Sequence, residues 1–260
     1  MEINAILLAA GEGTRLRPLT EHWPKCLMPI HGKPLMEYWL SDLFEIKPAS
    51  IFVNTSYLSS IVEEYLTRDR FAGRIKVLKE EVLLGTGGTL LSIKDYLRDK
   101  PTLVIHADNW CGMKILDLID QHQKYRPAHC TITMMTFETD TPETCGIVEL
   151  DSADVVQAFH EKQPNPPGNR ANAAVYIIEP EIISWMEERN TFDFTTEVIP
   201  HFMGQIFTVH NERFHRDIGN IKSLCKASAD PLKEIIWKEN DAWLDDFVYN
   251  PIHQLFNSLT

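Results

Sequence analysis

An apolar run that ends in two closely spaced glycines constrains this sequence more than any other feature. Residues Ile6 to Ala10 are apolar, and Gly11-Glu12-Gly13 follows at once. Such a run is typical of a buried strand that ends in a loop. Because glycines carry no side chain, the backbone N–H groups of this loop can lie close to a ligand. We therefore expect a core built around this strand, with a binding loop at its end.

Polar and basic side chains follow the glycines within a short segment, at Thr14, Arg15, Arg17 and Lys25. A polyanion at this loop would meet oriented amides, a planar guanidinium and an ammonium group together. The segment thus predicts a phosphate site. It is not a Walker loop, because no Gly-Lys-Ser/Thr follows at the required spacing, and it lacks the third glycine of the dinucleotide fingerprint, where Leu16 stands.

Composition limits the kind of ligand. The chain has 260 residues and a formal net charge of −12, with a pI near 5.3. Its length allows one substantial core, and its acidity argues against a nucleic-acid partner, which needs a basic field. A polyanionic ligand must therefore be small, and a divalent cation is expected to offset its charge.

The spacing of the cysteines and the hydropathy of the sequence indicate the cellular compartment of the protein. The five cysteines are scattered and include no C-x-x-C pair, which disfavours a zinc ribbon or a disulfide framework and favours a reducing cytoplasm. No basic segment with an apolar run opens the sequence, and no apolar stretch approaches membrane-spanning length. We expect neither a signal peptide nor a membrane span.

Strand-like and helix-like segments alternate in the first half. Helices are expected over residues 34–44 and 56–66 and from the glycine loop 84–89 to about Leu97, and strands over residues 51–54, 75–78 and 102–106. This alternation predicts a mostly parallel sheet with helices on its faces. Asp108 follows the last of these strands, and ligands in such sheets gather at the carboxyl ends of strands.

The second half is richer in strand-like segments, at residues 131–136, 146–150, 155–160 and 173–178. No linker separates the halves, so we expect an α/β, Rossmann-like fold with a smaller β-rich part, spanning residues 1–228. Residues 229–260 combine aromatic and acidic residues at helical spacing. We expect a helical tail that serves packing or a contact between subunits of a homo-oligomer.

Residues 11–25 as a whole resemble the G-x-G-T-R-L-x-P-L-T…P-K element of sugar-1-phosphate nucleotidylyltransferases, which make nucleoside-diphosphate sugars. The alternative is a surface turn with incidental basic residues. The matching positions are Gly11, Gly13, Thr14, Arg15, Leu16, Pro18, Leu19, Thr20, Pro24 and Lys25. Five ordered elements between residues 3 and 220 carry the resemblance. It implies in-line attack of a sugar 1-phosphate on the α-phosphorus of a nucleoside triphosphate, with release of pyrophosphate.

The resemblance implies a magnesium site at Asp108 and Asp217. The family has Gly-Asp after the strand and W-x-D-I-G-T later, whereas this chain has Ala107-Asp108 and Phe214-His-Arg-Asp217-Ile-Gly-Asn220. Both acids persist, although either alone could be a helix cap. Two carboxylates holding Mg²⁺ would neutralise the reacting phosphates.

The same resemblance assigns Arg15 to the triphosphate and its pyrophosphate leaving group, and Lys25 to the α-phosphate and the incoming phosphate. The expected catalytic residues are therefore Arg15, Lys25, Asp108 and Asp217. No protein nucleophile is needed, because the substrate supplies it. The residues expected to bind the nucleotide are Leu8, Ala9, Ala10, Gly11, Gly13, Thr14, Arg15, Lys25, Glu80, Gly85, Thr86 and Asp108.

Glu80 stands where uracil- and thymine-specific relatives often have glutamine. A carboxylate only accepts hydrogen bonds, and guanine offers it adjacent N1–H and NH₂ donors. We expect GTP over UTP, TTP or CTP, unless Glu80 points to solvent. The chain is then most like the guanylyltransferases of mannose 1-phosphate or heptose 1-phosphate.

Two further segments resemble the part of the family that binds the sugar 1-phosphate. Phe159-His-Glu-Lys resembles F-x-E-K-P, which implies Glu161 for sugar hydroxyls and Lys162 for the sugar phosphate. Asn172-Ala-Ala-Val-Tyr resembles N-A-G-x-Y, which implies sugar hydrogen bonds from Asn172. Gly146 follows Cys145 where many relatives have Tyr-Gly, and its backbone is expected to contact the sugar.

Three alternatives remain open at this stage. The chain could use UTP or TTP, or it could be a phosphocholine cytidylyltransferase, although Glu161-Lys162 favours a sugar acceptor. It could also be a non-catalytic sensor or regulatory subunit that binds nucleotide sugars. The changed flanks at Ala107, Ala174 and Asn220 permit a sensor, and the retained charged residues weigh against it.

Overall fold

The computed structural model describes residues 1–259. Its strands are β1 (Asn4–Leu8), β2 (Pro29–Ile30), β3 (Lys33–Pro34), β4 (Ser50–Thr55), β5 (Ile75–Lys79), β6 (Thr102–His106), β7 (Asn109–Cys111), β8 (Ile132–Glu138), β9 (Gly146–Leu150), β10 (Val156–Glu161), β11 (Arg170–Ile178), β12 (Ile206–His210) and β13 (His215–Asp217). Its α-helices are α1 (Leu35–Ile46), α2 (Ser59–Leu66), α3 (Gly85–Ser92), α4 (Lys94–Leu97), α5 (Ile115–Tyr125), α6 (Pro180–Arg189), α7 (Ile221–Ala229), α8 (Ala242–Phe247) and α9 (Pro251–Ser258). Short helical turns occur at Thr14–Leu16, Leu19–Glu21, Lys25–Leu27, Pro142–Thr144, Phe194–Val198 and Ile199–Phe202.

Within residues 1–259, nine strands form one hydrogen-bonded sheet in the order β10-β9-β11-β6-β1-β4-β5, with β8 paired to β11 and β12. The pairs β4–β5 and β8–β12 are parallel, whereas β11 runs antiparallel to β6, β8 and β9. β1 and β6 are parallel, because Asn4 N donates to Pro101 O near their starts and Ala107 N donates to Leu8 O past their ends. The predicted α/β fold, with a parallel centre and a β-rich part, is confirmed.

The chain divides into two compact units. Among the described residues, the first unit contains residues 1–6, 84–105 and 113–213, and the second contains residues 7–83, 106–112 and 214–259. Strands β1 and β6 each begin in the first unit and end in the second. The predicted boundary between residues 228 and 229 stays a prediction.

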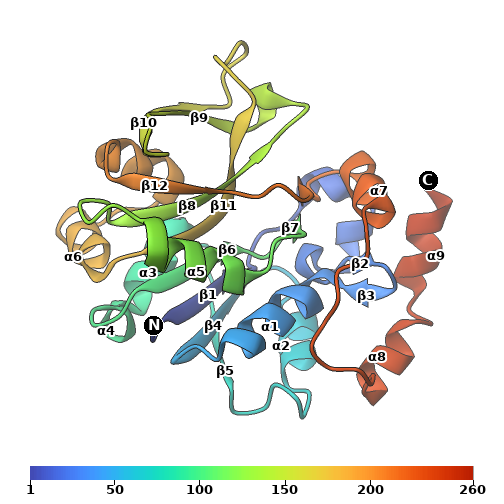
Figure 1. The fold of residues 1–260 in the computed structure, drawn as a ribbon. Coiled ribbons are helices and arrows are strands. Elements are labelled where there is room, and N and C mark those ends of the chain that lie inside the picture. Colours follow the sequence, from blue (N-terminus) through green and yellow to red (C-terminus); the bar gives the residue numbers. More distant parts are fainter. Residues whose placement is uncertain (260) are drawn as a thin grey trace. The chain divides into compact units, whose positions relative to one another are not determined.

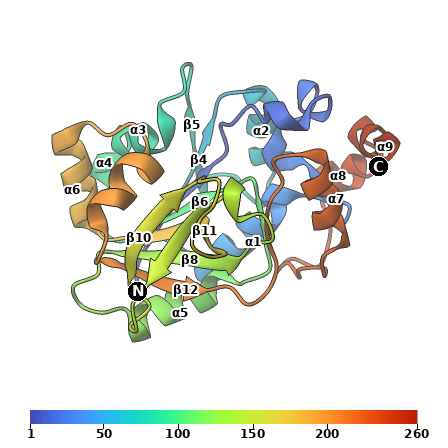
Figure 2. The same cartoon turned by 90° about the horizontal axis from the view of Figure 1, so that it is seen from above.

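The first unit contains the antiparallel part of the sheet. Figure 2 shows β8, β10, β11 and β12 together, and α5 packs against β12. α3 and α4 pack against α6. The predicted helix from the glycine loop to Leu97 is interrupted at Ile93, whose φ of −119° and ψ of 18° are not helical. The single expected helix is therefore two helices, α3 and α4.

The second unit contains β4 and β5, with α2 packed against them (Figure 1). α2 begins at Ser59 rather than at residue 56, because Leu58 has a φ of 50° in the left-handed region, where a helix cannot continue. A core cluster beneath the glycine turn (residues 11–14) includes Leu16, Leu19 and Met28 together with Phe247 and Phe256 from the C-terminal helices. The helices α8 and α9 therefore contribute side chains to the core of the second unit.

No helix among residues 1–259 combines the length and apolar character needed to cross a bilayer.

Candidate active site

Lys25 lies between two carboxylates in the second unit. Its Nζ is 2.6 Å from Asp108 Oδ2 and 2.8 Å from Asp217 Oδ1. The Lys25 side chain is 8% exposed, whereas that of Asp108 is 36% exposed and that of Asp217 is 50% exposed. A buried ammonium group thus faces two carboxylates that solvent can reach. The structure brings together three of the four residues predicted to be catalytic.

The backbone explains why Asp108 and Asp217 converge. β7 follows Asp108, and β13 ends at Asp217; the two strands form an antiparallel ribbon in which Asp217 pairs with Asn109. Ile218 N also donates to Asp108 O at 3.1 Å. The loop after β6 and the end of β13 are therefore joined by main-chain hydrogen bonds, and the side chains of both aspartates leave from this joint.

Arg15, the fourth predicted catalytic residue, lies beside the same carboxylate. Its Nη2 is 3.4 Å from Asp217 Oδ2, and its side chain is 69% exposed. Gly219 makes room for this contact, because a Cβ at residue 219 would lie 2.7 Å from Arg15 Nη2 and from Asp217 Oδ2. Arg15 is therefore a solvent-facing guanidinium at the edge of the carboxylate pair, available to an anion.

The glycine turn fits closely against the segment that carries Lys25. Gly13 has a φ of 64°, and a Cβ there would lie 3.1 Å from Lys25 Cβ. Thr20 Oγ1 donates to Gly13 O at 2.8 Å. Glycine at 13 is required for both the left-handed conformation and the close approach. Gly11, by contrast, faces open space.

Lys25 and Asp108 each stabilise the charged form of the other. Burial lowers the pKa of Lys25, but the carboxylates of Asp108 and Asp217 outweigh it and hold that pKa above its ordinary value. Burial raises the pKa of Asp108, but Lys25 and then His106 hold it below its ordinary value. Both groups are therefore charged at neutral pH.

Glu80 is buried and points away from solvent, which excludes the solvent-facing alternative. Only 7% of the residue is exposed, and its Oε1 accepts a hydrogen bond from Asn54 Nδ2 at 2.9 Å. Asn54 Oδ1 in turn accepts from Ala9 N at 2.6 Å. Asn54 thus links the loop after β1 to Glu80. Sequence reasoning missed Asn54, although a polar residue at the carboxyl end of a central strand is a known signal for a site.

Gly85 and Thr86, also predicted to bind the nucleotide, lie in the first unit. Gly85 has a φ of 72° and lies against Phe192, which leaves no space for a Cβ. Thr86 Oγ1 accepts a hydrogen bond from Phe194 N at 2.8 Å and lies 3.3 Å from Asp193 Oδ2. In this structure the Thr86 hydroxyl is engaged at the start of α3.

The residues predicted to bind the sugar phosphate all lie in the first unit. Gly146 and Glu161 face each other in the β9–β10 pair, and a Cβ at 146 would lie 2.6 Å from Glu161 Oε2. Lys162 Nζ is 3.1 Å from Glu161 Oε1, and 67% of its side chain is exposed. Glycine at 146 therefore leaves space beside the Glu161 carboxylate.

Asn172 lies in β11, which pairs with β9 at Ala171 and Ile147. Its Nδ2 donates to the Tyr176 hydroxyl at 2.6 Å, and its Oδ1 accepts from Ala174 N at 2.9 Å. Ala174, which replaces the glycine of the N-A-G-x-Y pattern, has a φ of 52°. Its left-handed conformation sits in a bulge, where the β11–β8 register shifts between Asn172 and Tyr176.

Comparison with protein families decides the identification. The family described as "Nucleotidyl transferase" matches residues 4–234. The chain belongs to the nucleotidyl transferase family. The match spans both units and includes every residue predicted to act in the site.

Curated relatives of this nucleotidyl transferase family member are longer than the chain. It is 29% identical over 239 residues to a mannose-1-phosphate guanylyltransferase of Mycobacterium tuberculosis, a match that covers 90% of this chain and 66% of the relative. It is 32% identical over 186 residues to the bifunctional protein GlmU of Methanocaldococcus jannaschii, covering 72% of this chain and 42% of that protein. The chain spans less than two thirds of the length of these relatives.

A solved structure confirms the fold. A Bacillus anthracis protein, provisionally named a glucose-1-phosphate thymidylyltransferase and solved with a sucrose, superimposes with a TM-score of 0.79. The match covers 91% of this chain and 98% of the other, at 19% sequence identity. At that identity the likeness establishes the architecture of this nucleotidyl transferase family member and nothing finer.

The donor set of the family member suits a hard divalent cation. Two carboxylate oxygens, from Asp108 and Asp217, already meet at one ammonium nitrogen. Mg²⁺ in proteins commonly takes one or two carboxylates and completes its shell with water and substrate phosphates. No cluster of three or more His, Cys, Asp or Glu side chains that could hold a metal ion occurs in residues 1–259. The two aspartates fit the predicted metal.

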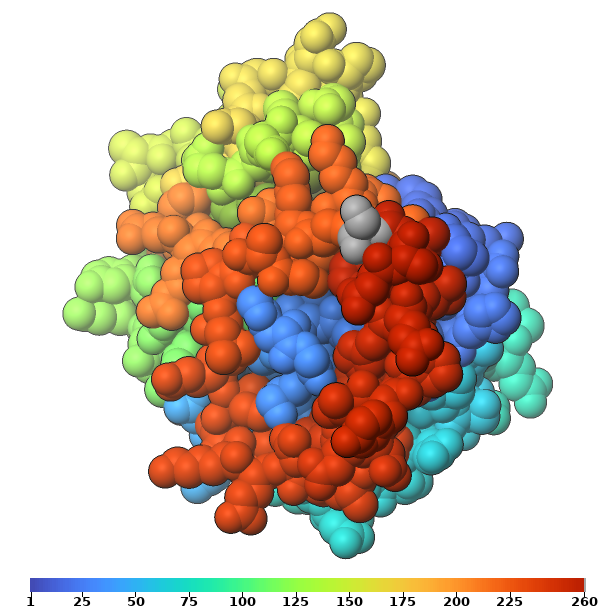
Figure 3. Space-filling model, turned by 90° about the vertical axis from the view of Figure 1, so that its right-hand side faces the viewer, coloured from blue at the N-terminus to red at the C-terminus, as the bar shows by residue number. Residues whose placement is uncertain are grey.

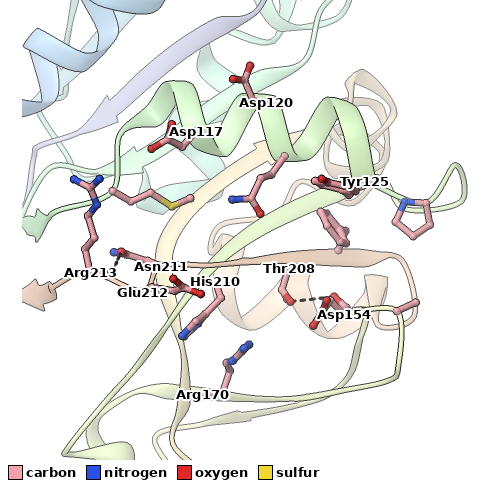
Figure 4. A pocket seen from close by; sticks show the side chains of 15 residues that line it. Asp117, Asp120, Tyr125, Asp154, Arg170, Thr208, His210, Asn211, Glu212 and Arg213 are labelled. Atoms are coloured by element: carbon pink, nitrogen blue, oxygen red, sulfur yellow. Dashed lines mark hydrogen bonds between the residues drawn. The ribbon is translucent and has the colours of Figure 1, made fainter.

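A cavity of about 880 Å³ lies in the first unit and is separate from the predicted site residues. Figure 4 shows side chains from α5, β11, β12 and the following loop around it, among them Asp117, Arg170 and Arg213. None of the predicted nucleotide or sugar-phosphate residues lines it. Its mixture of acidic and basic side chains indicates no single class of ligand.

Proposed function

We propose that this chain transfers a nucleotidyl group from a nucleoside triphosphate to a sugar 1-phosphate, giving a nucleoside-diphosphate sugar and pyrophosphate. The observation that supports this most is the position of Lys25 Nζ, within 2.8 Å of both Asp108 and Asp217 and beside the glycine turn. Membership of the nucleotidyl transferase family and the names of the curated relatives support the same reaction class.

In this proposal the protein works by positioning and by charge. The Lys25 ammonium remains charged, since its pKa is raised, and it neutralises the α-phosphate as the sugar phosphate oxygen attacks. Arg15, exposed beside Asp217, holds the departing pyrophosphate. The glycine turn contributes backbone N–H groups, because no side chain at Gly11 blocks them.

Asp108 and Asp217 would hold the divalent cation, with Mg²⁺ the proposed ion. When bound, such an ion supplies charge neutralisation to the phosphates. Asp108 is suited to this because Lys25 and His106 outweigh its burial and hold its pKa below its ordinary value, which keeps its carboxylate charged. Lys25 then keeps the two carboxylates from repelling each other before substrate arrives.

For the acceptor we propose a sugar 1-phosphate of the mannose or heptose type. Glu161 and Asn172 would accept and donate hydrogen bonds to sugar hydroxyls, with the backbone of Gly146 beside them, and the exposed Lys162 would bind the phosphate. The name of the Mycobacterium tuberculosis relative supports mannose 1-phosphate.

For the nucleotide we propose GTP. Glu80 Oε1 accepts a hydrogen bond from Asn54 Nδ2 at 2.9 Å, and a carboxylate acts only as a hydrogen-bond acceptor. Guanine presents adjacent N1–H and NH₂ donors, whereas uracil presents one donor between two carbonyls. We also propose a cytoplasmic enzyme, supported by five free cysteines.

The experiment is to incubate the protein with Mg²⁺, each of the four triphosphates and a panel of sugar 1-phosphates, and to follow pyrophosphate. Pyrophosphate release that is fastest with GTP and mannose or heptose 1-phosphate is expected. Preference for UTP or TTP would contradict the role of Glu80. Release with CTP and phosphocholine would favour the cytidylyltransferase alternative, and binding of a GDP-sugar without any turnover would favour a sensor.

A further inference from the structure

Residues 230–256 are anchored to the rest of the second unit by ion pairs. Arg216 forms a two-point contact with Asp230, at 2.6 and 2.9 Å. Lys233 Nζ lies 2.6 Å from Asp42 Oδ2, with both side chains less than 7% exposed. Asp241 lies 2.6 Å from Arg68, whose guanidinium also contacts the fully buried Glu37. Buried charges held this way are costly to separate, so the segment is fixed in place.

The anchored segment places an aromatic clamp on Trp23. Phe247 is stacked on Trp23 with ring centroids 5.8 Å apart, and Trp243 is stacked on Phe247 at 5.3 Å. Trp243 is in turn held edge-on by Tyr65 at 4.9 Å. α9 packs against the turn Leu19–Glu21 just before Trp23. Figure 3 shows the C-terminal residues, in red, around blue residues of the N-terminal part on this face.

Trp23 is joined to the turn that carries Lys25. Its indole Nε1–H donates to Leu27 O at 2.8 Å, and Leu27 ends the helical turn that begins at Lys25. Within that turn Leu27 N donates to Pro24 O and Met28 N donates to Lys25 O. The orientation of Trp23 therefore fixes the backbone from which the Lys25 side chain reaches the two carboxylates.

We propose that Trp23 and Phe247 are positioning residues, through which residues 230–256 set the placement of Lys25. Neither touches the carboxylates, and neither is among the residues predicted to bind substrate. A displacement of about 1 Å in a group that acts on the transition state can lower turnover about 100-fold. Loosening the clamp therefore reduces kcat while leaving the Michaelis constants nearly unchanged. The kinetic part of this inference rests on the proposed function.

Two conservative variants test the clamp without emptying the core. Trp23→Phe keeps a ring against Phe247 but removes the donor to Leu27 O, and Phe247→Leu keeps apolar volume but removes the stack. Each is expected to lower kcat about tenfold, with the KM values changed less than about twofold. The kcat of the double variant is expected to equal that of the slower single variant, because the two substitutions act through the same turn.

Two controls separate positioning from stability. Phe52→Leu shortens a buried aromatic residue of β4 in the same unit and is expected to lower the melting temperature with kcat unchanged. Tyr249→Ala removes an 83% exposed ring next to α8 and is expected to change neither the melting temperature nor kcat. All kinetics are measured at a temperature at which circular dichroism shows every variant folded.

Hydrogen exchange at the amides of Leu27 and Met28 gives a readout that needs no activity. Faster exchange at these amides in Trp23→Phe and Phe247→Leu, but not in Phe52→Leu, is expected. Unchanged exchange there, or wild-type kcat in both clamp variants, overturns the inference. If the wild-type protein releases no pyrophosphate, the proposed function fails and hydrogen exchange alone decides whether the clamp holds the Lys25 turn.

Discussion

Asp217 is paired with Asn109, the residue after Asp108, in the ribbon of β13 and β7. The main-chain hydrogen bond from Ile218 N to Asp108 O closes the end of the same ribbon. The separation of the two carboxylates is therefore set by backbone pairing, and Lys25 joins them as a third partner. Changes at Lys25 should consequently leave the two aspartates in place.

Replacing Lys25 by Met is expected to tighten divalent-cation binding and to remove most activity. The ammonium competes with a cation for the same two carboxylates, and a contact between two unit charges at about 4 Å corresponds to about 1 kcal/mol even in water. Titration calorimetry with Mg²⁺ or Mn²⁺ should show about fivefold tighter binding, with Lys238→Met as an exposed control. Weaker cation binding in Lys25→Met would show that the cation does not share the carboxylates with Lys25.

Glu80→Gln is expected to reduce preference for GTP. A hydrogen bond to a charged acceptor contributes about 1.5–3 kcal/mol, so kcat/KM for GTP should fall about 10- to 100-fold. The neighbouring exposed residue gives the control, since Glu81→Gln should leave all four triphosphates unaffected. Equal losses for GTP and UTP would mean that Glu80 supports the fold through Asn54 and does not read the base.

Ala174→Gly is expected to stabilise the protein. Ala174 has a φ of 52°, a left-handed conformation that costs a residue with a Cβ about 1–2 kcal/mol. Glycine removes this cost, but its greater backbone entropy in the unfolded chain offsets about half of the gain in stability. Urea unfolding should show a gain of about 1 kcal/mol. Ala173→Gly, one residue earlier and buried, should instead lose about 1 kcal/mol. A loss at both positions would contradict this account of the bulge.

His122 gives stability a defined pH dependence. It is 3% exposed in α5, its Nδ1 is 2.8 Å from Thr133 Oγ1, and its Nε2 is 3.5 Å from Glu179 Oε1. Burial, followed by the charge of Arg126, lowers its pKa to about 4. The unfolded chain therefore binds this proton first, near pH 6.5, and the folded protein only near pH 4.

The stabilisation associated with neutral His122 is fully present above about pH 6.5 and is lost as the pH falls towards 4. The total is about 3 kcal/mol. His122→Gln should remove this contribution to the pH dependence of the free energy of unfolding, as measured by urea unfolding between pH 7 and pH 4. Identical slopes in the two proteins would exclude a buried, neutral His122.

Much of the fold and of the site was predictable because it depends on local patterns. The strand before Gly11, the strand before Asp108 and the alternation of helices and strands each depend on periodicity and glycine placement. The family resemblance predicted that the carboxylates of Asp108 and Asp217 lie close together. The geometry now gives its cause in the β7–β13 ribbon.

The rest could not be predicted because it depends on contacts between distant segments. The link from Ala9 through Asn54 to Glu80 joins three strand ends, and the stack of Phe247 on Trp23 joins the two ends of the chain. The break at Ile93 and the left-handed Leu58 are backbone details that apolar periodicity does not encode. Whether the predicted residues bind substrate stays a prediction.

The most direct test of the central claim is pyrophosphate release by Asp217→Asn at saturating Mg²⁺, with GTP and mannose 1-phosphate as substrates. The substitution keeps the size of the side chain and removes the charge that faces Lys25 and Arg15. We predict a folded protein, by circular dichroism, with turnover at least about 100-fold below the wild type, while the exposed Asp246→Asn control stays fully active. Near-normal turnover of Asp217→Asn would contradict the account.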